Sequence, residues 1–156
     1  MLADGRGRTK MKILTTRFGV LTVEESDVLH FPAGMLGLEH CRKWVLLADA
    51  QNEALGWLQC TTRPEIALAV VSPRRFVPDY QVRVARSELA GLELADPKSA
   101  QVLAVLARNE QSITLNLRAP LVINLQTRVG RQVVTSSDQP IQHELTSQRS
   151  AWKKSA

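Results

Sequence analysis

The chain is poor in aromatic residues and in cysteine. Phenylalanine, tryptophan and tyrosine make up 4% of its 156 residues. A surface that stacks many nucleic-acid bases on exposed rings is therefore disfavoured. The two cysteines, Cys41 and Cys60, are too few for a disulfide-stapled scaffold and show no paired zinc-ligand spacing. We expect both thiols to be reduced and buried, with a disulfide as the less favoured alternative.

Long apolar runs are missing as well. No segment reaches the ~18–20 consecutive apolar residues that span a bilayer. Charges recur along the N-terminus up to Arg17, so the apolar region of a signal peptide is absent too. These absences predict a cytoplasmic protein without a membrane partner.

Motifs that carry catalysis are also absent. There is no nucleophile elbow, zinc-protease helix motif, phosphate-binding loop or dinucleotide-binding glycine pattern. His30 alternates with Leu29 and Phe31 in an apolar run, which indicates a surface or hydrogen-bonded core histidine. We predict that the protein is not an enzyme, with no catalytic residue, cofactor, metal or small-molecule substrate.

The charge that is present lies at the two ends. The net charge of +5 invites a nucleic-acid or membrane-surface interpretation. However, residues 1–10 carry +2, residues 146–156 carry +3, and residues 11–145 hold 14 basic and 14 acidic residues. We therefore expect flexible basic extensions at 1–10 and 146–156 around a neutral domain at 11–145. Whether residues 1–10 are a genuine extension, and what the tails do, stays open.

Apolar residues in the body recur mostly with a period of two, which is typical of half-buried strands. The runs are short and are separated by Gly, Pro, Asn and Asp, and Gly130 marks a predicted tight turn. The predicted strands are Val20–Glu24, Val28–Phe31, Trp44–Ala48, Leu55–Cys60, Ile66–Val71, Asp79–Val84, Ile113–Leu117, Leu121–Leu125 and Gln132–Thr135. This pattern predicts an all-β fold, a compact antiparallel β-barrel-like single domain with short connections.

One stretch admits two interpretations. Residues 98–108 contain good helix formers and could make one short helix. As a strand, Val102–Ala107 would pair with Ile113–Leu117 and be buried on both faces. We favour the strand and keep the helix as the alternative.

Asparagines inside two apolar runs are unusual, because asparagine is disfavoured in strands. Asn116 lies between Leu115 and Leu117, and Asn124 between Ile123 and Leu125. Either each amide ties down a neighbouring loop or each contacts a partner.

The ordered motifs resemble the bacterial flagellar assembly factor FliW family over about residues 11–145. The most specific run is Thr114–Asn124, with the pattern T-x-N-L-x-A-P-x-x-I-N. It is preceded by L-H-F-P-x-G-x-x-G-x-E at Leu29–Glu39, by Trp57–Gln59 and by S-P-x-x-F-x-x-D-Y at Ser72–Tyr80, and is followed by Gly130–Val134. Leu38 and the Gln139–Pro140 pair depart from residues usual in the family.

The resemblance implies a cytoplasmic, non-enzymatic partner switch. Similar proteins bind flagellin before export and also bind the translational repressor CsrA, which relieves repression of flagellin mRNA. The residues that carry the motifs are the candidate partner contacts: Pro32, Gly34, Gly37, Glu39, Phe76, Asp79, Tyr80, Asn116, Arg118 and Asn124. Phe76 and Tyr80 could be rigid aromatic anchors or could pack in the core.

A second function class remains open at this stage. The pI near 9.7 and the short strands are also compatible with an OB-like barrel that binds RNA through its basic tails and surface. The neutral body and the scarcity of aromatic residues argue against direct RNA binding.

Overall fold

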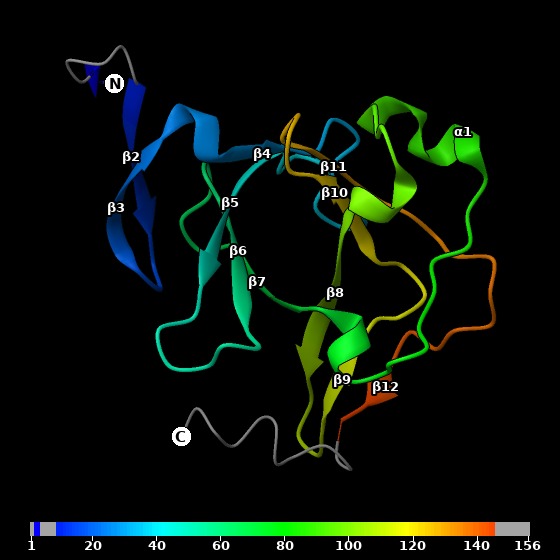
Figure 1. Ribbon diagram of the computed structural model, residues 1–156. Helices are drawn as coiled ribbons and strands as arrows, with labels where there is room; N and C mark the ends of the chain where they lie inside the picture. Colours follow the sequence, from blue (N-terminus) through cyan, green and yellow to red (C-terminus); the bar gives the residue numbers. More distant parts are fainter. Residues whose placement is uncertain (1, 4–8, 146–156) are drawn as a thin grey trace.

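Seven strands close into a barrel in the computed structural model, which describes residues 2–3 and 9–145 (Figure 1). The proposed tail at 146–156 lies outside the described residues, as does most of the extension at 1–10. The barrel strands are β4 (Val28–His30), β5 (Lys43–Ala48), β6 (Gly56–Cys60), β7 (Ala67–Val71), β8 (Gln101–Arg108), β10 (Leu121–Asn124) and β11 (Val129–Gln132). The predicted all-β, barrel-like fold is confirmed.

The ring closes through β8, which has different neighbours along its length. Its first residues pair with β10, where Val102 lies opposite Val122, and its middle pairs with β7, where Val105 lies opposite Val70. At the other seam β11 runs parallel to β4, with Val129 opposite His30. A closed ring leaves none of these seven strands with a fully open edge.

The interpretation of residues 102–107 as a strand is therefore confirmed, and the helix alternative is wrong. Leu106 of β8 pairs with Leu115 of β9 (Ile113–Leu115), as predicted, and β9 continues to β12 (His143–Glu144). The α-helix of the described chain is α1, Arg86–Leu89, followed by the 3-10 turns η3 (Ala90–Leu92) and η4 (Pro97–Ser99). Successive β8 side chains pack into two different core clusters: Leu103 and Val105 into one, and Ala104 and Leu106 into the other. A strand points alternate side chains to opposite faces in this way, whereas a helix does not.

The main core cluster joins apolar side chains from several strands of the barrel. Phe31, Trp44, Leu58 and Ile123 are fully buried, and the Trp44 indole Nε1–H donates to the Cys41 carbonyl oxygen at 2.9 Å. Cys41 and Cys60 are free and buried in the same cluster, as predicted. Burial, together with the neighbouring Cys60, raises the pKa of the Cys41 thiol to about 11, so this thiol is protonated at neutral pH.

Two local predictions are wrong, and a third, the strand Gln132–Thr135, holds only for Gln132, the last residue of β11. Gly130 is not in a turn: it lies in β11 opposite Ile123, and the turn spans residues 125–128, with Arg128 in the left-handed region at φ 60°. A Cβ on Gly130 would lie 2.5 Å from Cζ of Phe31, so glycine is required there by close packing.

Asp79–Val84 is not a strand either. Its backbone bonds instead to the distant segment 135–136, which is not a strand: the Arg83 N–H donates to Thr135 Oγ1 at 2.9 Å, and the Ser136 N–H donates to the Arg83 carbonyl at 2.7 Å. The alternation of apolar residues at Val82 and Val84 reflects packing of these side chains against apolar clusters of the barrel strands, and it does not require a partner strand.

A β-hairpin stands beside the barrel (Figure 1). It consists of β2 (Thr9–Thr15) and β3 (Gly19–Glu24), with β1 (Leu2–Ala3) pairing to the start of β2. The strand β2 is not among the predicted runs, although Met11 and Ile13 alternate with polar neighbours. Ile13 packs against Val28 and Val45 of the barrel.

The hairpin turn is held by an aromatic contact. The Arg17 guanidinium lies 4.2 Å from the ring centre of Trp57, and the Phe18 ring meets Trp57 edge-on at 5.9 Å.

Two further 3-10 turns, η1 (Glu25–Asp27) and η2 (Pro73–Arg75), link strands. Within residues 2–3 and 9–145, no helix is long and apolar enough to cross a membrane.

Candidate partner-binding surface

The loop after β4 carries the first group of candidate residues and is held in one shape by backbone geometry. Gly34 has φ 68°, and a Cβ on it would lie 2.7 Å from the Glu39 Cα, so only glycine fits. Gly37 also has a positive φ, of 80°. Backbone hydrogen bonds from Gly34 N–H to the Phe31 carbonyl and from Leu38 N–H to the Met35 carbonyl, each 2.8 Å, close two consecutive turns.

This loop presents Leu36 to solvent. Leu36 is 73% exposed, the highest value among the large apolar residues exposed in the described chain, whereas the preceding Met35 is 4% exposed. The Leu36 N–H donates to Gln132 Oε1 at 2.9 Å, and Gln132 Nε2 donates to the Ala119 carbonyl at 3.1 Å. One glutamine of β11 thus fastens the loop to the T-x-N-L-x-A-P segment.

Glu39 closes the loop from its other end. Its carboxylate accepts a hydrogen bond from the Gly37 N–H at 3.2 Å. Hydrogen bonds from the backbone N–H groups of Glu39 itself and of Gly37 hold the pKa of this carboxyl below its ordinary value. The ionised form is the one that accepts these bonds, so Glu39 acts as a brace at neutral pH.

Two hollows flank Leu36, and Met35, Leu36 and Gln132 line both. The larger, of about 480 Å³, continues to Val134, which is 61% exposed. The smaller, of about 260 Å³, continues to Ile141, which is 55% exposed. We call this region the Leu36 surface. An exposed apolar knob between two hollows is a shape that accepts apolar side chains of a protein partner.

Charges border only the larger hollow. Arg131 Nη2 lies 3.2 Å from Glu88 Oε2, and Arg131 Nη1 also donates to the Glu88 carbonyl at 3.0 Å. Arg83 and Glu39 complete the charged lining. The two positive and two negative charges balance, so the lining has no net charge and its exposed apolar side chains are its main feature.

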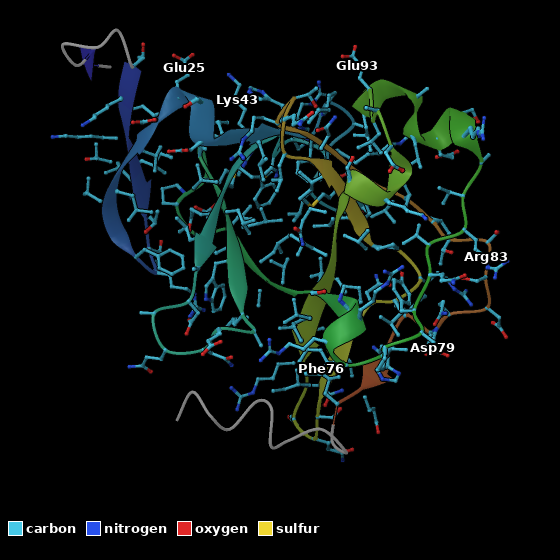
Figure 2. The ribbon with its side chains drawn as sticks, viewed as in Figure 1. Glu25, Lys43, Phe76, Asp79, Arg83 and Glu93 are labelled. Atoms are coloured by element: carbon cyan, nitrogen blue, oxygen red, sulfur yellow. The ribbon has the colours of Figure 1, made fainter. Side chains whose placement is uncertain are left out.

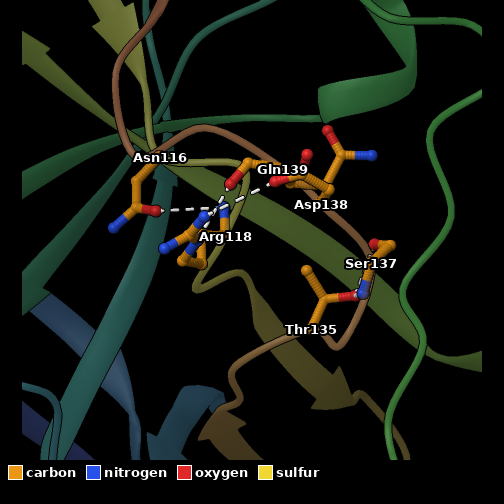
Figure 3. A network of polar contacts seen from close by, with 6 residues as sticks. All are labelled: Asn116, Arg118, Thr135, Ser137, Asp138 and Gln139. Carbon is orange, nitrogen blue, oxygen red and sulfur yellow. Dashed lines mark hydrogen bonds and ion pairs between the residues drawn. The ribbon is translucent and has the colours of Figure 1, made fainter.

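The second group of candidates, Asn116 and Arg118, belongs to one network of polar contacts (Figure 3), and of the two only Asn116 lines the smaller hollow. Asn116 Oδ1 accepts hydrogen bonds from the Arg118 and Ala119 N–H groups at 3.1 and 3.0 Å. Arg118 Nε donates to the Gln139 carbonyl at 2.9 Å, and its Nη2 lies 3.8 Å from Asp138 Oδ1. Asn116 therefore ties down its own turn while its side chain lines the hollow.

Asn124 has a supporting position. It is buried: its Nδ2 donates to the Leu92 carbonyl at 2.8 Å, and its Oδ1 accepts the Gln126 N–H at 2.9 Å. It thereby joins η3 to the turn after β10. The sequence leaves two alternatives open for the asparagines, attachment of a loop or contact with a partner. Asn124 is buried and attaches loops, whereas Asn116 attaches its own turn and also lines the smaller hollow.

The third group of candidates lies apart from the Leu36 surface. Phe76 and Tyr80 are each 2% exposed and pack in the cluster around Leu115 and Leu117. Both residues therefore pack in the core, which is one of the two alternatives that the sequence leaves open. The Tyr80 hydroxyl donates to the Leu117 carbonyl at 2.6 Å, and burial raises the pKa of this phenol to about 12. Asp79 is exposed at the periphery (Figure 2).

The structure thus brings Gly34 and Glu39 together with Asn116 around one exposed leucine. Pro32 and Gly37 belong to the same loop but line neither hollow, and neither does Arg118. Sequence reasoning missed the apolar members Leu36, Val134 and Ile141 and the polar Gln132 that fastens the loop. A signal existed for Leu36, because two glycines flank it in a short loop. None existed for Val134 and Ile141, which become neighbours of Leu36 only through folding. No metal-binding cluster occurs in the described parts of the chain.

Comparison with known proteins covers most of the chain. The family model described as "FliW protein" matches residues 12–145. The flagellar assembly factor FliW of Natranaerobius thermophilus is 32% identical over 139 residues, 86% of this chain and 92% of that protein. That of Bdellovibrio bacteriovorus is 36% identical over 126 residues, 80% of this chain and 72% of that protein.

A solved structure agrees. A crystal structure of the flagellar assembly factor FliW matches with a TM-score of 0.79 at 26% identity, over 86% of this chain and 96% of that one. The sequence resemblance is confirmed by the family model, by the relatives and by the fold. The chain belongs to the FliW family of flagellar assembly factors.

Proposed function

We propose that this flagellar assembly factor acts in the cytoplasm by binding rather than by catalysis, and that its two partners are flagellin and the translational repressor CsrA. While flagellin is abundant it occupies the factor. Once flagellin has been exported, the freed factor captures CsrA, and translation of flagellin mRNA resumes. The switch needs no chemistry beyond competition for one limited pool of protein.

The observation that carries this proposal is the Leu36 surface. A leucine that is 73% exposed costs solvation free energy, yet two glycines, Gln132 and Glu39 hold it outward. A rigid apolar knob loses little conformational entropy on binding, which favours a role as an interface anchor. We place the contact with at least one of the two partners here.

Linkage limits the proposed mechanism. If this protein weakens the binding of RNA to CsrA by a given factor, RNA must weaken the binding of CsrA to this protein by the same factor. A coupling of about 1–3 kcal/mol corresponds to roughly 5–150-fold. The neutral balance of charges in residues 11–145 fits an antagonist that need not touch RNA itself.

Calorimetry with purified flagellin and CsrA, separately and together, tests the proposal. We expect saturable binding of each, with flagellin reducing the binding of CsrA. Leu36→Asp should weaken at least one interaction by roughly 30-fold, the loss expected of a buried hot spot of about 2 kcal/mol. The matched control is Leu14→Asp, which alters a 62%-exposed leucine on the hairpin.

The outcomes distinguish the proposed function from the proposed location of the contact. Absence of both interactions would overturn the partner switch. Binding of both partners with unchanged affinity in Leu36→Asp would overturn only the location. An RNA shift assay over a salt series checks the other class: tight binding that weakens steeply with salt would indicate direct RNA contact.

A further inference from the structure

A separate basic hollow lies where β7 leaves β8. The pairing of these two strands ends at Val71 and Ala104, and Pro73 then begins η2 and turns the chain away. The first residues of β8 therefore lose their neighbour on that side and pair only with β10. The space left between η2 and β8 has a volume of about 500 Å³.

Arg74 is fixed at the wall of this hollow. Its Nε donates to the Tyr80 carbonyl at 2.9 Å. Tyr80 is itself anchored, since its ring is buried and its hydroxyl donates to Leu117. The Nε bond orients the guanidinium, and within the described chain both Nη nitrogens remain without a partner. Such a preoriented fork suits bidentate binding of a carboxylate.

A second cation contributes to the same lining. Lys98, in η4, is exposed, and its ammonium makes no ion pair or hydrogen bond with a described residue. Ser72 and Gln101 supply neutral polar groups. Among the described residues no carboxylate lines the hollow: Asp79 and Asp96, the nearest acids in sequence, are not part of its lining. The lining thus carries two positive charges with no internal counter-charge.

The remaining lining is apolar and includes Val82 and Val102. Two unpaired cations beside aliphatic side chains match a ligand in which acidic and aliphatic groups alternate. We propose that this hollow binds an acidic peptide segment of a protein partner, with one carboxylate on the Arg74 fork, a second on Lys98, and an aliphatic side chain against Val82 and Val102.

A peptide fits better than phosphate or nucleic acid for two reasons. The described chain offers no phosphate-binding glycine loop here, and the lining combines the two cations with aliphatic side chains, which an anion alone would leave uncovered. The hollow also shares no lining residue with the Leu36 surface. The inference is therefore independent of which partner Leu36 contacts.

The test is an amide NMR titration of the full chain with the peptide acetyl-Leu-Glu-Asp-Leu-Glu-amide. The comparison peptide replaces Glu by Gln and Asp by Asn. We expect saturable shifts at the amides of Ser72, Arg74, Arg75, Gln101 and Val102 with the acidic peptide, and binding of the neutral peptide that is at least about tenfold weaker. Arg74→Gln with Lys98→Gln should reduce affinity about tenfold or more.

Arg75→Gln is the matched control, because Arg75 lies in the same 3-10 turn but does not line the hollow. Its affinity should stay within about twofold of the parent chain. Lys98→Gln alone removes an exposed side chain without described contacts, so it tests the site even if Arg74→Gln impairs folding. Equal losses in the Arg75 and Lys98 variants, no saturable shift, or tighter binding of inorganic phosphate at the same amides would each overturn the proposal.

Discussion

Phe31 and Leu36 lie five residues apart in one motif, and the structure uses them in opposite ways. Phe31 is fully buried in the barrel, with its ring against Gly130 of β11. Leu36 is 73% exposed at the tip of the loop that follows. Both are large apolar residues, so residue type alone does not separate a folding role from a binding role.

The difference lies in how the backbone around each residue is held. Phe31 gains its stability from packing, since a barrel strand on each side excludes water from its ring. Leu36 gains none from packing, and its loop is shaped by glycine geometry and by polar bonds from Gln132 and Glu39. A motif that appears uniform in sequence therefore divides into a part that folds the chain and a part available to a partner.

The largest effect in this comparison should come from Phe31→Ala. Removing a fully buried ring forfeits its transfer free energy and leaves a cavity, a cost of roughly 3–5 kcal/mol. Urea unfolding followed by tryptophan fluorescence measures it. A loss below about 1 kcal/mol would show that the core collapses around the missing ring.

Gly130→Ala should have the next largest effect. The new Cβ would lie 2.5 Å from Cζ of Phe31, and overpacking of this kind costs roughly 1–3 kcal/mol. Gly91→Ala is the control, because a Cβ at Gly91 meets nothing within 4 Å. In a double-mutant cycle Phe31→Leu should relieve part of the cost. Strict additivity would contradict the proposed contact.

Tyr80 provides a prediction about alkaline pH. Burial raises the pKa of its phenol to about 12, above the value of 10 expected for the unfolded chain. The protonated form is favoured by folding, so this stabilisation is fully present below pH 10 and is lost as the pH rises toward 12. Tyr80 is the only tyrosine, so absorbance titration at alkaline pH follows it alone.

Tyr80→Phe supplies the control for that titration. It should lose about 0.5–1.5 kcal/mol at neutral pH, because the Leu117 carbonyl loses its donor. Between pH 10 and 12 its stability should fall less than that of the parent chain. Equal alkaline losses in both proteins would assign the effect to other groups.

The smallest effect on stability should come from Leu36→Ala. An exposed side chain of this kind contributes little to folding, so the free energy of unfolding should change by less than about 0.5 kcal/mol. Affinity for flagellin or CsrA should nevertheless fall. A variant that loses stability but keeps both affinities would reverse the roles assigned to Phe31 and Leu36.

Much of the barrel was predictable, because period-two alternation reports which strands are half-buried. The strands at Trp44–Ala48 and Leu121–Asn124 follow from a second signal, a short continuous apolar run bounded by turn residues, and all four residues of β10 are buried. Asp79–Val84 shows the limit of the pattern: its valines alternate, yet no neighbouring strand bonds to this segment. Alternation records burial of side chains, whereas a strand also requires a bonded neighbour, and that neighbour is set by the whole fold.

The candidate site was predictable in its scaffold and not in its apolar contacts. Glycines at 34 and 37 and the acid at 39 indicate a tight loop from sequence alone. The Leu36 surface also needs Gln132 and Ile141, about a hundred residues further along the chain. The same holds for the basic hollow, which Arg74 and Lys98 line together only because β7 turns away from β8.

The sequence by itself determined the all-β class, the neutral body, the family resemblance and the position of the constrained glycine loop. Each of these depends on local composition or spacing, which the unfolded chain already contains. Tertiary structure alone decided that Phe31 is buried while Leu36 is exposed, that Gly130 serves packing rather than a turn, and that two cations face one hollow. Those outcomes depend on which distant segments become neighbours when the ring of strands closes.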